Sequence, residues 1–124
     1  MTLQTVLILS LPVLLASLAQ FCFKKGVLNL GDLNFSLLGL FSLLPKIFQN
    51  IWLVIGLFLF GLSFLFYLFA LSKFQLNIVY PMVVSAGIAI ITILSWILFR
   101  EGLSTLQILG IIAIIFGIFL IFPR

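Results

Sequence analysis

Two long apolar runs in the second half of the chain, joined by a polar elbow, restrict what this sequence can fold into. The first run covers residues 76–99 and the second extends from Ser104 to about Phe122, with Arg100-Glu101-Gly102 between them. A helix needs about 20 apolar residues to cross the hydrocarbon core of a bilayer, and both runs approach that length. We therefore expect two transmembrane helices here, connected by a short turn at one face of the membrane.

The rest of the chain has the same character. Of the 124 residues, 65% are hydrophobic and 6% are charged, whereas soluble domains carry about 25% charged residues. Two further apolar runs cover residues 3–23 and 51–71. The first is not expected to be a removable signal peptide, because it lacks a basic leading segment and a small-residue cleavage pattern. The predicted fold is an all-α membrane protein, a single domain over residues 1–124 with four transmembrane helices.

The segment between the first two spans is a shorter element. Gly31-Asp32 interrupts it, and a run rich in Leu and Phe then extends from Asn34 to Leu44. About eleven residues are too few to cross a bilayer. The run is therefore predicted to be an interfacial amphipathic or re-entrant helix, which Pro45 separates from the second span. A long, strongly tilted second helix that begins near Phe35 is the alternative.

The ends of two helices carry recognisable signals. Lys24-Lys25-Gly26 is predicted to end the first helix, because cations suit a helix C-terminus and glycine readily takes the left-handed conformation of a C-cap. Ser104 and Gln107 have the spacing of a capping box at the start of the fourth helix.

The residue types argue against several classes of site and partner. The single cysteine, Cys22, has no partner for an intramolecular disulfide, and without histidine a metal site of the Cys/His type is not expected. Neither a catalytic triad nor a phosphate-binding loop is present, so we expect no enzyme and no cofactor. The net charge of +4 results from six basic and two acidic residues, and the basic ones lie at helix ends and in loops. This pattern favours membrane lipid as the partner and not nucleic acid.

Polar side chains in and beside the spans are the candidate binding residues. Because two spans separate the turn after the first helix from the turn after the third, both turns lie on the same side of the membrane. Lys24, Lys25, Arg100 and Glu101 can therefore approach one another, and the lysines can bind an anionic group such as a lipid phosphate. The candidate substrate-binding residues are Gln20, Lys24, Lys25, Tyr80, Ser85 and Glu101.

Each candidate also has an interpretation that needs no substrate. The lysines suit a positive-inside anchor, and Gln20 suits a hydrogen bond to a neighbouring helix. Tyr80 suits the aromatic belt at the membrane interface. Glu101 suits a loop carboxylate paired with a nearby cation. The sequence leaves both interpretations open.

An ordered set of residues in the second half of the chain resembles a known group of transporters. The residues are Tyr80-Pro81, Gly87, Ser95-Trp96, Phe99, Glu101, Gly110 and Gly117. Their order and spacing resemble the drug/metabolite transporter superfamily. Its four-helix members are the nearest patterns: the small multidrug resistance exporters and the two subunits of the undecaprenyl-phosphate-aminoarabinose flippase. The resemblance implies a half-sized transporter of the bacterial inner membrane that acts as a homo- or heterodimer.

Compared with the small multidrug resistance exporters, the chain lacks two residues. Those proteins carry a glutamate in the middle of the first helix, which binds the cationic drug and exchanges it for protons. The matching position here is Ala16 or Ser17, and an aromatic residue of the exporters is replaced by Val83. We therefore predict movement of a lipid-linked or anionic substrate. The alternatives are an exporter of small organic cations and a non-transporting accessory subunit of a larger membrane complex.

Two glycines of the fourth span are predicted to form the dimer interface. Gly110 and Gly117 lie seven residues apart, and thus on nearly one face of a helix with 3.6 residues per turn. Small residues on one face let helices approach closely in lipid. The spacing resembles the dimer-contact pattern in the fourth helix of the small multidrug resistance exporters.

Overall fold

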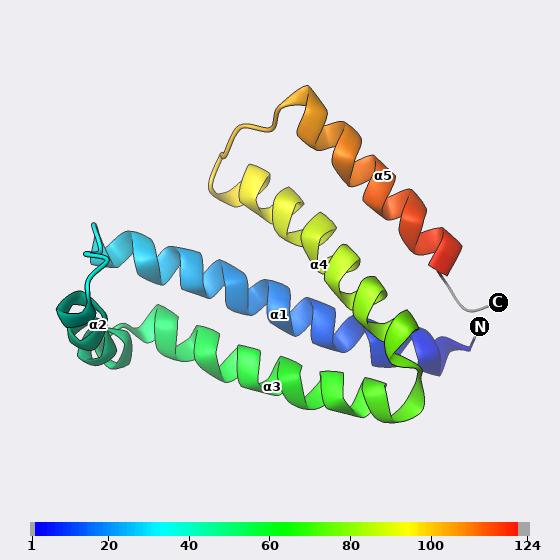
Figure 1. Cartoon of the computed structure of the whole chain (residues 1–124), viewed down its shortest axis with the longest axis horizontal. Coiled ribbons are helices and arrows are strands. Elements are labelled where there is room, and N and C mark those ends of the chain that lie inside the picture. Colours follow the sequence, from blue (N-terminus) through cyan, green and yellow to red (C-terminus); the bar gives the residue numbers. More distant parts are fainter. Residues whose placement is uncertain (1, 122–124) are drawn as a thin grey trace.

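The computed structural model describes residues 2–121, which are helical apart from short connections. In chain order the helices are α1 (Leu3–Leu30), α2 (Leu37–Gln49), α3 (Ile51–Lys73), α4 (Leu76–Leu98) and α5 (Thr105–Ile121) (Figure 1). The all-α prediction is confirmed, and Ser104 and Gln107 bond each other's backbone N–H as the capping box predicts.

The predicted set of four spans is only partly correct. The described residues form five helices, of which α1, α3 and α4 are long and apolar enough to cross a membrane. The segment expected at the interface is the additional helix, α2, with 13 residues. The expected fourth span corresponds to α5, whose 17 residues make it shorter than the other three. Its predicted end at Phe122 lies outside the described residues.

The predicted end of the first helix is wrong. α1 continues through Lys24, Lys25 and Gly26 to Leu30, and the glycine with a positive φ that follows it is Gly31, at 74°. Gly26 is buried against α3, where an added Cβ would lie 2.6 Å from Cγ of Leu53. This glycine therefore permits close helix packing instead of ending the helix.

The boundary between α2 and α3 also differs from the prediction. Pro45 lies inside α2, and the helix ends at Gln49, followed by Asn50, whose backbone is extended. The side chain of Asn50 accepts a hydrogen bond from the backbone N–H of Trp52 at 3.0 Å and donates one to the carbonyl oxygen of Gly26 at 3.1 Å. The Asn50 amide thus caps α3 and ties its start to α1. The alternative of one long second helix is excluded.

α3 packs along α1 for most of its length (Figure 1). Besides the contact at Gly26, the hydroxyl of Ser63 donates a buried hydrogen bond of 2.7 Å to the carbonyl oxygen of Pro12. An added Cβ at Gly56 would lie 2.7 Å from the ring of Phe23. Small residues and the hydrogen bonds from Ser63 and Asn50 to α1 therefore hold this pair together, as is usual for helices in lipid.

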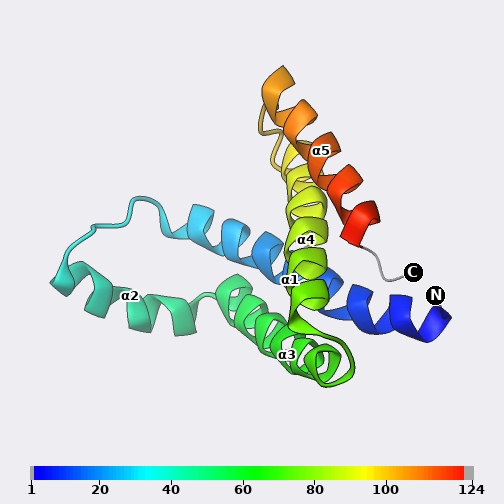
Figure 2. The same cartoon turned by 45° about the vertical axis from the view of Figure 1, so that its right-hand side comes forward.

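α4 diverges from α3 after the short turn between them and crosses α1 (Figure 2). A cluster of four buried side chains joins the three helices near this turn: Leu9, Ala70, Val79 and Met82. α5 returns along α4, and none of its described residues is buried. The arrangement leaves a space between α1 and α4 that α3 does not fill.

Candidate functional site between α1 and α4

One face of α1 borders two cavities that follow each other along the helix. The lining residues of α1 recur at intervals of three and four positions, which places them on a single helical face. The other wall of both cavities comes mainly from α4. We call this feature the α1–α4 groove.

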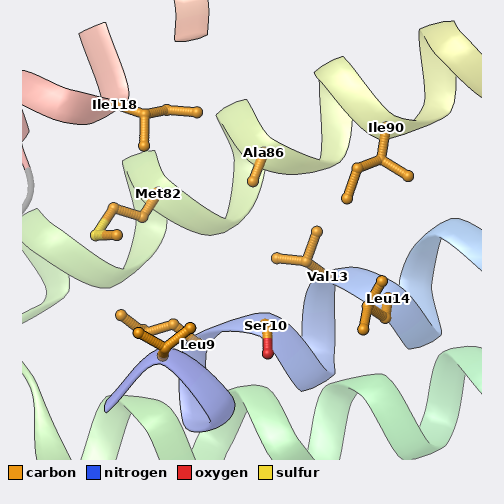
Figure 3. Close-up of a pocket in the computed structure, with 9 residues that line it drawn as sticks. Leu9, Ser10, Val13, Leu14, Met82, Ala86, Ile90 and Ile118 are labelled. Atoms are coloured by element: carbon orange, nitrogen blue, oxygen red, sulfur yellow. The ribbon is translucent and has the colours of Figure 1, made fainter. Parts of the chain in front are cut away.

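The first cavity of the groove is apolar and has a volume of about 230 Å³. Its one polar lining residue, Ser10, donates its hydroxyl to the carbonyl oxygen of Leu7. Val13 and Ile90 point toward each other across the space, and Ile118 of α5 lies at its edge (Figure 3). The complete lining is Val6, Leu9, Ser10, Val13, Leu14, Met82, Ala86, Ile90 and Ile118.

The second cavity has a volume of about 210 Å³ and is more polar. Three of the six predicted site residues line it: Gln20 and Lys24 from successive turns of α1, and Glu101 from the loop after α4. Its complete lining is Ser17, Gln20, Phe21, Lys24, Ile91, Leu94, Ser95, Phe99 and Glu101.

An ion pair lies at the polar end of the groove. Nζ of Lys24 is 3.2 Å from Oε1 of Glu101, and each side chain is 47% exposed. The hydroxyl of Ser95 donates a hydrogen bond to the other carboxylate oxygen, Oε2. The pair joins the C-terminal half of α1 to the loop beyond α4. The predicted approach of the two turns therefore occurs for Lys24 and Glu101.

The backbone after α4 aims Glu101 back toward the groove. Arg100 has a φ of 54°, the one non-glycine residue among positions 2–121 with a positive value. This left-handed conformation reverses the chain, so the backbone N–H of Glu101 reaches the carbonyl oxygen of Ser95 at 3.4 Å. The Ser95 hydroxyl and then the Lys24 ammonium lower the pKa of Glu101 below its ordinary value. Glu101 is therefore a carboxylate at neutral pH.

The remaining predicted site residues lie outside the groove. Nζ of Lys25 stands 4.2 Å from the ring centroid of Trp52 and 5.8 Å from that of Phe21, so this lysine faces α3. Tyr80 is 57% exposed and Ser85 is half-buried, and neither lines the two cavities. The structure thus brings together Gln20, Lys24 and Glu101 and separates the other three from them.

Two serines that the sequence did not nominate line the polar cavity. Ser17 is buried and donates its hydroxyl to the carbonyl oxygen of Val13 at 2.7 Å. Its place on the groove face of α1 was readable from its spacing to Gln20 and Lys24. Ser95 binds Glu101 only because the chain reverses at Arg100, which no local pattern indicates.

The two glycines predicted at the dimer interface lie on α5. A Cβ added at Gly110 or Gly117 would meet nothing within 4 Å. Gly110 is exposed and Gly117 is half-buried, so there is space for a side chain beside both. Within residues 2–121 no three side chains of the metal-ligating kind come together.

The sequence model of a family described as Small Multidrug Resistance protein matches residues 40–114. The chain belongs to the small multidrug resistance protein family. The resemblance to small multidrug resistance transporters is confirmed, and the chain is a small integral membrane protein of a transporter family. The match takes in α3 and α4 entirely, whereas α1 lies outside it. No solved structure matches the fold.

Proposed function

We propose that this protein moves an anionic, lipid-linked substrate across the bilayer through the α1–α4 groove. The observation that carries the proposal is the polarity of the groove, which is apolar in its first cavity and ends at the Lys24–Glu101 ion pair. An apolar chain gains free energy from burial in the first cavity. The Lys24 ammonium has three N–H donors, so it can donate a charge-assisted hydrogen bond to a phosphate while it remains paired with Glu101. The two parts of one amphiphilic molecule match the two parts of the groove.

The size of the groove agrees with a substrate that remains partly in the bilayer. An apolar cavity of about 150 Å³ binds benzene, and the two cavities here have volumes of about 230 and 210 Å³. Each accommodates a ring or a short stretch of chain, and not a whole lipid. The remainder of the substrate would extend between the helices into the acyl region.

The position of the acidic residues disfavours exchange of a cation for protons within the membrane. The chain contains two acidic residues, Asp32 and Glu101, and both lie in loops between helices. Ser17, at a position where the exporters' glutamate is expected, has its hydroxyl bonded to its own helix. Glu101 is already paired with a lysine. A permanent organic cation would therefore have to displace Lys24 to find a carboxylate in the α1–α4 groove.

Family members typically act as dimers in the membrane, and we propose α5 as the surface for a second subunit. A second copy or a homologous chain could pack against Gly110 and Gly117, where an added Cβ would meet nothing within 4 Å. We propose the inner membrane of a bacterium as the location of this dimer.

Reconstituted vesicles that contain a fluorescent short-chain polyprenyl phosphate test the proposal. Movement of the probe between leaflets is measured with an impermeant quencher for the wild type, Lys24→Gln, Lys24→Arg and Glu101→Gln. Lys73→Gln at the far end of α3 is the matched control. Movement should fall in Lys24→Gln, be retained in Lys24→Arg and stay normal in Lys73→Gln.

Full movement in Lys24→Gln, with normal insertion, would contradict the proposal and leave Lys24 as a topology anchor. Transport of organic cations by the wild type, with no movement of the probe, would favour the exporter alternative. An inactive protein that purifies with a second protein in fixed ratio would favour the accessory subunit.

A further inference from the structure

α2 has three distinct faces along its 13 residues. Its half-buried residues are Gly39, Leu43 and Ile47, and they mark the side turned toward the protein. A second face is apolar and exposed: Leu37, Leu40, Phe41, Leu44 and Phe48 are between 49% and 77% exposed, and Leu38, 84% exposed, lies between this face and the polar one. The third face is polar and carries Ser42, Lys46 and Gln49. An exposed apolar row opposite a polar row containing a cation is the pattern of helices that lie in a membrane interface.

The direction of α2 agrees with this pattern. In Figure 1 α2 is seen nearly end-on, whereas α1 and α3 run across the picture. α2 therefore lies across the end of these two helices, which are long enough to span a bilayer. If α1 and α3 cross the membrane, α2 runs along its surface.

A hollow lies where α2 meets the ends of α1 and α3. Its volume is about 350 Å³, and Lys46 and Gln49 from the polar face of α2 line it together with Asn29, Asn50 and Trp52. Lys25 stands over the same indole, with Nζ 4.2 Å from the ring centroid. α2 contains no acidic residue, and Asp32 of the preceding connection is not part of the lining. The hollow thus offers a cation, a tryptophan and three side-chain amides, of which that of Asn50 already bonds Gly26 and Trp52.

We infer that α2 lies in the plane of the membrane surface and that this hollow binds the headgroup of an anionic phospholipid. The Lys46 ammonium and the side-chain amides of Gln49 and Asn29 supply donors for the phosphate. The acyl chains of the same lipid lie against the exposed apolar row of α2. The site is separate from the α1–α4 groove, shares none of its lining residues and does not depend on the proposed transport function.

The orientation of α2 is tested by spin labels on the full-length protein in nanodiscs of phosphatidylcholine with phosphatidylglycerol. Single cysteines replace residues 40–49 one at a time after Cys22→Ser. Labels at Phe41, Leu44 and Phe48 should be accessible to oxygen, and labels at Ser42, Lys46 and Gln49 to a water-soluble nickel reagent. If accessibility to oxygen and accessibility to the nickel reagent alternate along residues 40–49 with the period of a helix, α2 lies in the plane of the membrane. A steady change of depth from residue 40 to residue 49 would overturn it.

The headgroup site is tested by native mass spectrometry of the protein extracted from the same lipid mixture. Lys46→Gln should retain about fivefold less phosphatidylglycerol than the wild type, the factor that corresponds to about 1 kcal/mol for one cation at an anionic membrane surface. Lys73→Gln, at the opposite end of α3, is the control and should retain wild-type amounts. Phosphatidylcholine retention should be the same in all three proteins.

Equal retention of phosphatidylglycerol in Lys46→Gln and the wild type would overturn the site. An equal loss in Lys46→Gln and Lys73→Gln would also overturn it, because it would reflect net charge alone. Movement of the polyprenyl phosphate probe is expected to survive Lys46→Gln, so failure of this inference is distinguishable from failure of the transport proposal.

Discussion

Gly56 and Gly61 lie on the same helix, α3, yet the structure predicts opposite effects when each is replaced by alanine. A Cβ at Gly56 would lie 2.7 and 2.8 Å from two ring carbons of Phe23 and 3.2 Å from Cβ of Cys22. A Cβ at Gly61 would meet nothing within 4 Å. The Phe23 ring also packs against Phe60, with 6.1 Å between centroids, so its displacement disturbs a second contact.

The expected free energies follow from two opposing effects. Alanine is favoured over glycine in a helix by about 1 kcal/mol, and overpacking a filled interface costs about 1–3 kcal/mol. Gly61→Ala should therefore stabilise the protein by up to about 1 kcal/mol. Gly56→Ala should be less stable than Gly61→Ala by about 1–3 kcal/mol, because the helix-propensity gain is common to both.

The measurement is unfolding of the purified protein in mild detergent by titration with sodium dodecyl sulfate, followed by circular dichroism. Both variants are exposed to the same detergent and have the same added methyl group, so each controls the other. Equal midpoints, or a higher midpoint for Gly56→Ala than for Gly61→Ala, would refute the close α1–α3 contact at Gly56.

Three further predictions concern other parts of the molecule. Asn50→Ala should destabilise the protein by about 1.5–3 kcal/mol, because it removes both the α3 cap and the hydrogen bond to α1. Asn50→Asp keeps the cap and should destabilise the protein by about half as much. Equal losses of stability for the two variants in the same unfolding assay would contradict this prediction. Glu101 is the one glutamate in the chain, so ¹³C-glutamate NMR should show its titration below 4.5 and a shift toward that value in Ser95→Ala. Because folding lowers this pKa, the stabilisation from Glu101 should be present at neutral pH and lost as the pH falls through the pKa of the folded protein. An unchanged Glu101 titration in Ser95→Ala would show that Ser95 does not donate a hydrogen bond to the carboxylate. Gly117→Leu should reduce chemical crosslinking between subunits, and undiminished crosslinking would remove this face of α5 from the dimer interface.

The candidate site was partly predictable because membrane topology constrains which turns meet. Counting spans placed Lys24 and Glu101 on one side of the membrane, and their side chains are 3.2 Å apart. Counting spans also predicted that Lys25 would approach Glu101 as Lys24 does. In a helix adjacent residues point about 100° apart, so Lys25 faces Trp52 of α3 while Lys24 faces the groove.

Hydrophobicity and length along the sequence determined that the protein is helical and membrane-embedded, because a backbone in lipid must satisfy its hydrogen bonds internally. They also located most helix boundaries, since polar residues and capping signals interrupt the apolar runs. The role of each glycine was decided only by tertiary structure: Gly26 looks like a helix stop, yet it is where α1 and α3 approach each other. The groove likewise arises because α4 diverges from α3 and crosses α1. The crossing angle of two helices depends on which small residues meet between them. The hydrophobic periodicity of either helix alone does not predict that pairing.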